Sequence, residues 1–269
     1  MMQTVRILLM SYTLVFLCSA ESGGELCERL KKEPVDWPAL GIVLNSQPTK
    51  VVLDCLKESF YAFKTKADKQ AVAAALVEIG GDSQVGKNDD QMIFNYLSQL
   101  AEAAIDHDAP MFMKYDAAGR IVRKEYNLDF EKWCRQNNVG VEQEIRLQVF
   151  DLPEDVRFLS GTLDARSVPI LKRGILSHNP WIAEASARSL GLQDRTEVVP
   201  VLLLAIEQLP GEAKEVVASA LPLFNSVEAA KAFQKFIPDV QRRESWTRES
   251  TKYRLAHQKR VRARSEKSF

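Results

Sequence analysis

The chain has 269 residues, of which 46% are hydrophobic and 27% charged, an ordinary globular composition that suffices for one large domain or two small ones. Lysine plus arginine and aspartate plus glutamate number 36 each, so the net charge of zero excludes a chain that is uniformly basic or acidic. The charge is nevertheless uneven, because residues 242–269 hold ten basic and three acidic side chains (+7), which leaves 26 basic and 33 acidic ones (−7) elsewhere.

The N-terminus is typical of a secretory signal peptide. Arg6 supplies a positive charge, residues 7–17 are largely apolar, and the small residues Cys18 and Ala20 precede a polar stretch. The apolar run is shorter than the roughly 20 residues that span a bilayer, so we expect cleavage near Ala20 rather than a permanent anchor. The alternatives are an N-terminal core helix and a lipoprotein signal, and Leu17 argues against the second because lipoprotein signals place a small residue before the cysteine. No later stretch is long and apolar enough to span a membrane.

Cleavage there leaves three cysteines, Cys27, Cys55 and Cys134. An oxidising compartment permits a disulfide, and we expect Cys27 to pair with Cys55 and so tie an irregular N-terminal segment to the first helix, 51–63. Cys134 follows a tryptophan in an apolar context and is expected to be a buried thiol. The chain contains no Cys-x-x-Cys, which argues against a zinc ribbon or a thioredoxin-like redox site.

Two helices are predicted over residues 51–63 and 71–80, the second rich in alanine. The following stretch, 81–88, comes close to a phosphate-binding loop. Asn88 stands where that loop needs a hydroxyl, aspartates follow it, and a helix precedes it where a strand is required. We therefore expect a connection between helices, with Asp89 or Asp90 as N-cap.

The middle of the chain departs from this pattern. An amphipathic helix is predicted over 90–105, followed by Asp106-His107-Asp108, whose side chains point in different directions on any regular backbone and do not predict a metal site. Residues 111–115 and 121–126 alternate around a short loop with Gly119 and predict a β-hairpin. A helix is expected over 130–137. The hairpin is either an insertion on a binding face or a structural plug over the end of the first helical layer.

An internal repeat of 31 residues marks the C-terminal half. Val168-Pro169-Ile170-Leu171 recurs as Val199-Pro200-Val201-Leu202, and the same offset relates further apolar positions: Ile175 to Ile206, Ala187 to Ala218, Leu190 to Leu221, Leu192 to Leu223, and, one step on, Leu202 to Phe233 and Ile206 to Ile237. A period of this length is typical of stacked supersecondary units. Each unit is predicted to be two helices, the first with proline near its start.

These residues resemble the HEAT-repeat family. The turn Ser177-His178-Asn179-Pro180 followed by 182–191 matches its turn and second helix, and 71–80 matches the second helix again. The resemblance covers roughly 48–81 and 156–238. It implies an α-α superhelix and says little about function, because such arrays serve many unrelated ones.

No group of residues predicts catalysis. Gly-x-Ser-x-Gly is absent, and so is the His-Glu pair in which some HEAT-like metal enzymes place their ligands. The carboxylate pairs Glu142 with Glu144 and Glu154 with Asp155 have the pattern of an ordinary solvated helix. We therefore expect no catalytic, cofactor-binding or metal-binding residue.

The tail from residue 241 interleaves aromatic and basic residues. It either binds an anionic lipid, polysaccharide or nucleic acid, without specific nucleic-acid recognition, or folds onto the acidic body of the protein itself. The candidate surface-binding residues are Arg242, Arg243, Trp246, Arg248, Tyr253, Arg254, Lys259 and Arg260.

The sequence thus predicts a mainly α-helical secreted or periplasmic protein that binds another protein and is not an enzyme. Its expected parts are a signal peptide (1–20), a helical region with one HEAT-like pair (21–110), a hairpin insertion (111–126), HEAT-like repeats (127–240) and a basic tail (241–269). The alternatives are a surface-associated protein held to an anionic envelope component by the tail, and an enzyme with a site between repeats.

Overall fold

The computed structural model describes residues 23–45, 50–79, 87–161 and 165–265. The expected signal peptide and the loop at 81–86 lie outside these ranges. The N-terminal helices are α1 (Gly23–Leu30), α2 (Trp37–Asn45), α3 (Lys50–Ala62), α4 (Lys66–Ile79) and α5 (Lys87–Ile105). Each packs on a neighbour in this group, and α5 also contacts later helices.

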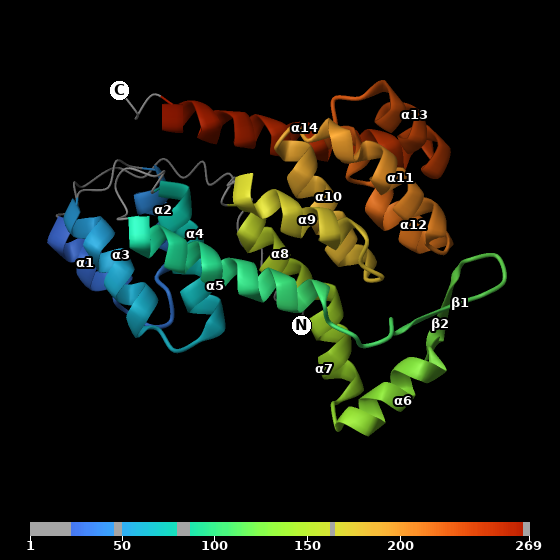
Figure 1. Ribbon diagram of the computed structural model, residues 1–269, viewed down its shortest axis with the longest axis horizontal. Coiled ribbons are helices and arrows are strands. Elements are labelled where there is room, and N and C mark those ends of the chain that lie inside the picture. The colour runs from blue at the N-terminus through green and yellow to red at the C-terminus, as the bar shows by residue number, and fades with distance from the viewer. Residues whose placement is uncertain (1–22, 46–49, 80–86, 162–164, 266–269) are drawn as a thin grey trace.

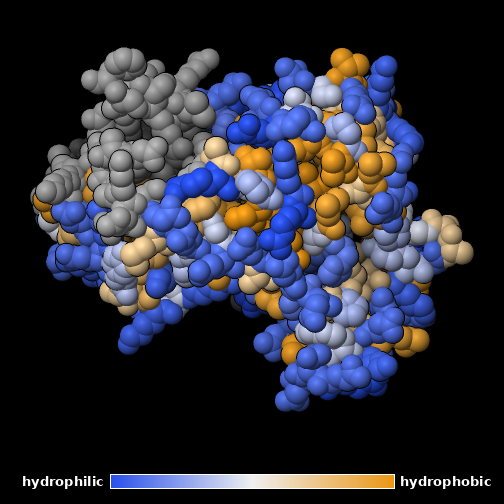
Figure 2. Space-filling view, in the orientation of Figure 1, coloured by the Kyte–Doolittle hydropathy of each residue, from blue (hydrophilic) through white to orange (hydrophobic). Residues whose placement is uncertain are grey.

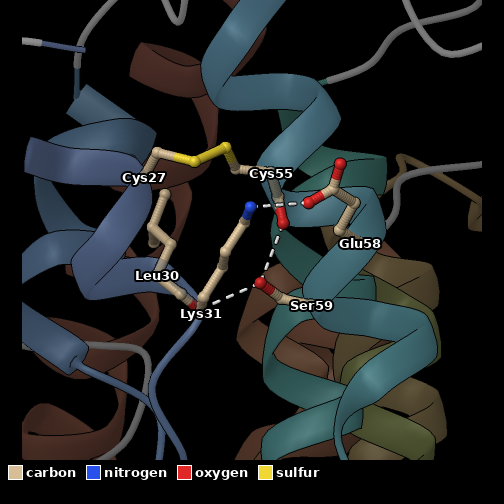
Figure 3. Close-up of a disulfide and its surroundings, with 6 residues drawn as sticks. All are labelled: Cys27, Leu30, Lys31, Cys55, Glu58 and Ser59. Carbon is tan, nitrogen blue, oxygen red and sulfur yellow. Dashed lines mark hydrogen bonds and ion pairs between the residues drawn. A yellow bond between two sulfur atoms is a disulfide. The ribbon is translucent and has the colours of Figure 1, made fainter. Parts of the chain in front are cut away.

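A disulfide joins α1 to α3. The pairing is the predicted one, but the expectation of an irregular N-terminal segment is wrong, because Cys27 lies in the helix α1 and two helices precede α3. Cys27 and Cys55 are both buried, with their Cα atoms 5.6 Å apart. Beside the bridge, the Ser59 hydroxyl donates to the carbonyl of Leu30 across the two helices (Figure 3). For a loop of this length, chain entropy gives about 3–4 kcal/mol of stabilisation. Cys134 is a free, buried cysteine, also as predicted.

The predicted hairpin is present as an antiparallel pair, β1 (Met113–Tyr115) and β2 (Ile121–Tyr126). The Asp116 carboxylate organises the turn by accepting from the backbone N–H groups of Ala118 and Arg120. The hairpin projects from the side of the helical body (Figure 1). Its first strand starts later than the expected residue 111. Just before it, the Phe112 carbonyl accepts from the N–H of Asn127, and the Phe112 ring stacks on Trp181 with 5.8 Å between the centroids.

The helices that follow the hairpin are α6 (Leu128–Asn137), α7 (Val141–Arg146) and α8 (Leu152–Gly161). A π-helical turn, η1 (Leu147–Asp151), joins α7 to α8 without a break. Pro153, just after this turn, has no N–H to donate, and such a local loss of the regular bonding is a common cause of helix distortion.

The C-terminal half repeats a pair of helices. Its elements are η2 (Ala165–Ser167), α9 (Val168–Ile175), α10 (Pro180–Leu192), η3 (Thr196–Val198), α11 (Val199–Gln208), α12 (Gly211–Ala218), η4 (Leu221–Leu223), α13 (Val227–Phe236) and α14 (Val240–Ser265). Pro169 and Pro200 lie in the first turns of α9 and α11, as expected from the repeat. Asn179 caps α10 by accepting from the N–H groups of Trp181 and Ile182.

Positions related by the 31-residue offset are buried alike. Leu171, Leu202 and Phe233 are all buried, and so are Ile175 and Ile206. The first helices contact one another in series, α9 with α11 and α11 with α13, while α10 contacts α12 in a second layer (Figure 1). One hydrophobic cluster runs from Leu26 in α1 to Ile237 after α13, so α1 to α5 and α8 to α13 share a single core, to which α6 and α7 contribute no residue. The protein is therefore mainly helical with a small antiparallel sheet.

No helix in the described ranges is long and apolar enough to cross a bilayer.

Candidate functional site

The basic tail forms one helix, α14, that packs against the end of the repeats. The tilted rings of Trp246 and Phe233 lie 6.5 Å apart between centroids, and Ser250 is buried. The Arg254 guanidinium donates to the carbonyls of Pro222 and Leu223 at 2.8 Å each, which satisfies two backbone groups of η4. Two of the candidate surface residues, Trp246 and Arg254, thus hold the helix in place.

A cation–π contact joins α14 to α10. The Arg188 guanidinium lies 4.8 Å from the centroid of the Tyr253 ring and bonds to Glu184. Burial opposes the charge of Arg188, but the pKa of Arg188 is raised because Glu184, helped by Tyr253 and Glu249, favours the charged form. Burial also raises the pKa of Tyr253, helped by Glu249. Tyr253 therefore also anchors the helix.

The remaining candidates differ in what they contact. Arg242 forms an ion pair with Glu215, whereas Arg243 donates to the carbonyls of Ile237 and Pro238. A carbonyl carries no net charge, so its bond leaves the positive charge of Arg243 in place. Arg248 is exposed. The side chains of Lys259 and Arg260 lie outside the described residues.

An open groove of about 560 Å³ runs along this helix. The lining residues on α14 recur at helical spacing and form one wall of the groove. Residues of α13 and of the segment at η4 form the opposite wall and the floor. The lining residues are Leu221, Pro222, Phe224, Ala230, Phe233, Gln234, Val240, Arg243, Glu244, Thr247 and Arg248. Apolar side chains thus form the interior, and the charged ones belong to α14. Figure 2 shows apolar residues gathered over the part of the molecule built by α10 to α13, beside strongly hydrophilic ones.

The hairpin contacts α12 through its tip. The carbonyl of Gly119 accepts from the N–H of Glu212 at 3.2 Å, and the Ile121 N–H donates to the Glu212 carboxylate. Gly119 has φ +75°, and a Cβ there would lie 2.7 Å from the Gly211 nitrogen. This close backbone approach fastens the turn to the start of α12, a contact that fits the structural-plug alternative.

A second polar cluster surrounds the segment that leads into the hairpin. His107 Nε2 lies 2.7 Å from the Glu144 carboxylate, which also accepts from Gln148 Nε2. Gln148 donates in addition to the carbonyl of Pro110, and His178 contacts the carbonyl of Ala109. Both described histidines that flank this segment thus bond to the protein itself.

The expectation that Glu144 and Asp155 are solvated carboxylates is wrong. Glu144 is 1% and Asp155 4% exposed, because partners far along the chain reach them. Asp155 accepts from Lys66 and Gln70 of α4, which links the N-terminal helices to α8. Pairing over 37 or more residues leaves no local signal in the sequence.

The described residues contain no group of three His, Cys, Asp or Glu side chains placed to hold a metal ion. Asp106, one of the three adjacent residues considered above, pairs with Arg173 of α9, while His107 turns to Glu144.

The chain matches no family model, and no curated protein or solved structure matches it either.

Proposed function

We propose that the protein is an extracytoplasmic helical-repeat scaffold that binds another protein in the groove between α13 and α14. The observation that carries this proposal is the groove itself, an apolar interior open to solvent with charged side chains on one wall. Protein-binding surfaces commonly combine an apolar centre with a polar rim. The equal burial of repeat-related positions supports a HEAT-like array, and such arrays expose extended surfaces to partners.

The disulfide supports an oxidising compartment outside the cytoplasm. Together with the signal-like N-terminus it favours a secreted or periplasmic protein.

The proposal is tested by photo-crosslinking in extract of the native source. A benzophenone amino acid replaces Gln234, an exposed residue that lines the groove, or Gln143, an exposed residue of α7 that does not line it. We expect a discrete crosslinked protein from position 234 and none from position 143. No crosslinked protein at 234, or the same set of proteins at both positions, contradicts the proposal.

A second candidate is a tether that holds the protein to an anionic surface, which the positive charge of α14 favours. Binding of this kind weakens steeply with added salt, whereas contacts with an apolar interior persist.

A further inference from the structure

We propose that the occupant of this groove is an acidic, amphipathic segment of the partner protein, with apolar side chains on the groove interior and carboxylates facing α14. This inference rests on the proposed function and specifies the chemistry of the partner.

The charge on the α14 wall is the first step of the argument. Residues 240–265 hold nine basic and two acidic side chains, a net charge of +7, and none of the acidic ones follows Glu249. Among those described, Arg242 is neutralised by Glu215, whereas Arg243 and Arg254 bond to uncharged carbonyls. Of the basic residues of α14, Arg243 and Arg248 line the groove together with Glu244, so the groove wall carries a net charge of +1 within the positive field of the rest of the helix.

The shape of the groove is the second step. Its α14 residues Val240, Arg243, Glu244, Thr247 and Arg248 recur at spacings of three and four and so share one helix face. Across from them stand Ala230 and Gln234, four residues apart on α13 and both exposed. Two facing helix surfaces over an apolar floor suit a peptide that presents its own apolar residues at three- and four-residue intervals.

The distribution of charge on α14 argues against a lipid surface. A helix that lies in a membrane interface needs an apolar face opposite its basic one. On α14, the apolar and aromatic residue Trp246 packs on α13, and the ring of Tyr253 is covered by Arg188. The described apolar side chains of α14 that face solvent, Val240 and Leu255, are 56% and 61% exposed and lie far apart along the helix, so they do not form the continuous apolar face that an interfacial helix needs. The complementary ligand therefore combines negative charge with apolar groups.

The test measures binding of designed 18-residue peptides to the oxidised full chain by fluorescence anisotropy. One peptide has leucine at every third or fourth position and glutamate on its polar face. Matched peptides carry glutamine or lysine instead of glutamate, and a fourth has the leucines shuffled. We expect the glutamate peptide to bind about tenfold more tightly than the lysine peptide at low salt, and more tightly than the other two.

Three variants locate the binding. Arg248→Glu reverses a charge on the groove wall, and Lys252→Glu makes the same change on an exposed α14 residue that does not line the groove. We expect the first to weaken binding of the glutamate peptide by about fivefold or more and the second by less than about twofold. Ala230→Phe, which fills the groove, is expected to abolish binding of both the glutamate and the glutamine peptides.

Equal binding of the glutamate and glutamine peptides, with both lost in Ala230→Phe, overturns the acidic partner and leaves the groove as a protein-binding site. No effect of Ala230→Phe overturns the groove as the site. Equal effects of Arg248→Glu and Lys252→Glu, together with binding to vesicles that contain about one third phosphatidylglycerol, overturn the proposal in favour of a membrane tether.

Discussion

The guanidinium of Arg188 lies over the ring of Tyr253, 4.8 Å from its centroid, and so connects the C-terminal helix α14 to α10. Arg188 is held in turn by Glu184 of its own helix. Tyr253 lies on α14, which forms one wall of the groove, but neither Tyr253 nor Arg188 lines it.

Replacement of Tyr253 by alanine is expected to loosen α14. Loss of a partly desolvated cation–π contact costs about 1–2 kcal/mol, and the amides of α14 then exchange faster with solvent. Hydrogen exchange measured by mass spectrometry checks this result. Tyr253→Phe keeps the ring and is the matched control, so equal protection of α14 in both variants and the native protein would contradict the assigned role of the ring.

Removal of the disulfide is expected to lower the free energy of unfolding by about 3–4 kcal/mol, because the unfolded chain loses a constraint on its N-terminal loop. Urea unfolding of the native protein with and without reductant measures the difference. The double variant Cys27→Ser with Cys55→Ser should match the reduced protein and be insensitive to reductant. A response of that variant to reductant would place the stabilising bond elsewhere.

The pairing of Cys27 with Cys55 and the positions of the repeated helices could be predicted, since each rests on a signal that the sequence carries locally or at a fixed period. Proline at the start of α9 and α11 and apolar residues at helical spacing sufficed to place those helices.

The groove and the polar clusters could not be predicted, because they depend on contacts between distant segments. In the sequence, Phe233 and Leu221 are recognisable only as apolar positions of the 31-residue repeat. No local pattern indicates that both also line a groove beside α14. Glu144 resembles any carboxylate on a solvated helix until His107, 37 residues earlier, reaches it. In the same way, the tail residues Trp246, Tyr253 and Arg254 resembled an external binding patch although they hold α14 in place.

Gly119→Ala is expected to detach the hairpin turn from α12. Alanine disfavours a φ of +75°, and its Cβ would meet the Gly211 backbone, so we expect a loss of about 1–2 kcal/mol. Ala117→Ser in the same exposed turn is the control. Nearby, burial and Glu212 raise the pKa of Tyr115 to about 12.

Ultraviolet titration of Tyr115 reports on this detachment, because a freed hairpin exposes the phenol and returns its pKa toward the ordinary value of about 10. In the native protein the folded state holds the Tyr115 proton more tightly than the unfolded chain. The associated stability is therefore complete below about pH 10 and lost as the pH rises toward 12. An unchanged titration in Gly119→Ala would show that the turn contact does not position Tyr115.

Asp155→Asn is expected to change how stability depends on pH. Burial raises the pKa of Asp155, although hydrogen bonds from Lys66 and Gln70 act in the opposite direction. The folded protein then retains a proton that the unfolded chain releases above about pH 4, so stability from this group is complete below that pH and is lost as the pH rises through the raised pKa. Asparagine cannot ionise and removes the effect.

Urea unfolding of both proteins at a series of pH values between about 3.5 and 7 tests this expectation. The free energy of unfolding of the native protein, minus that of Asp155→Asn, should fall as the pH rises across this range. Burial also raises the pKa of Glu154, and the neighbouring Asp155 charge adds to this effect, so the difference between the two proteins reports on the Glu154–Asp155 pair rather than on Asp155 alone. A difference that grows with pH would mean that the ionised Asp155 is favoured by folding, and that its bonds to α4 outweigh the loss of solvent around the carboxylate.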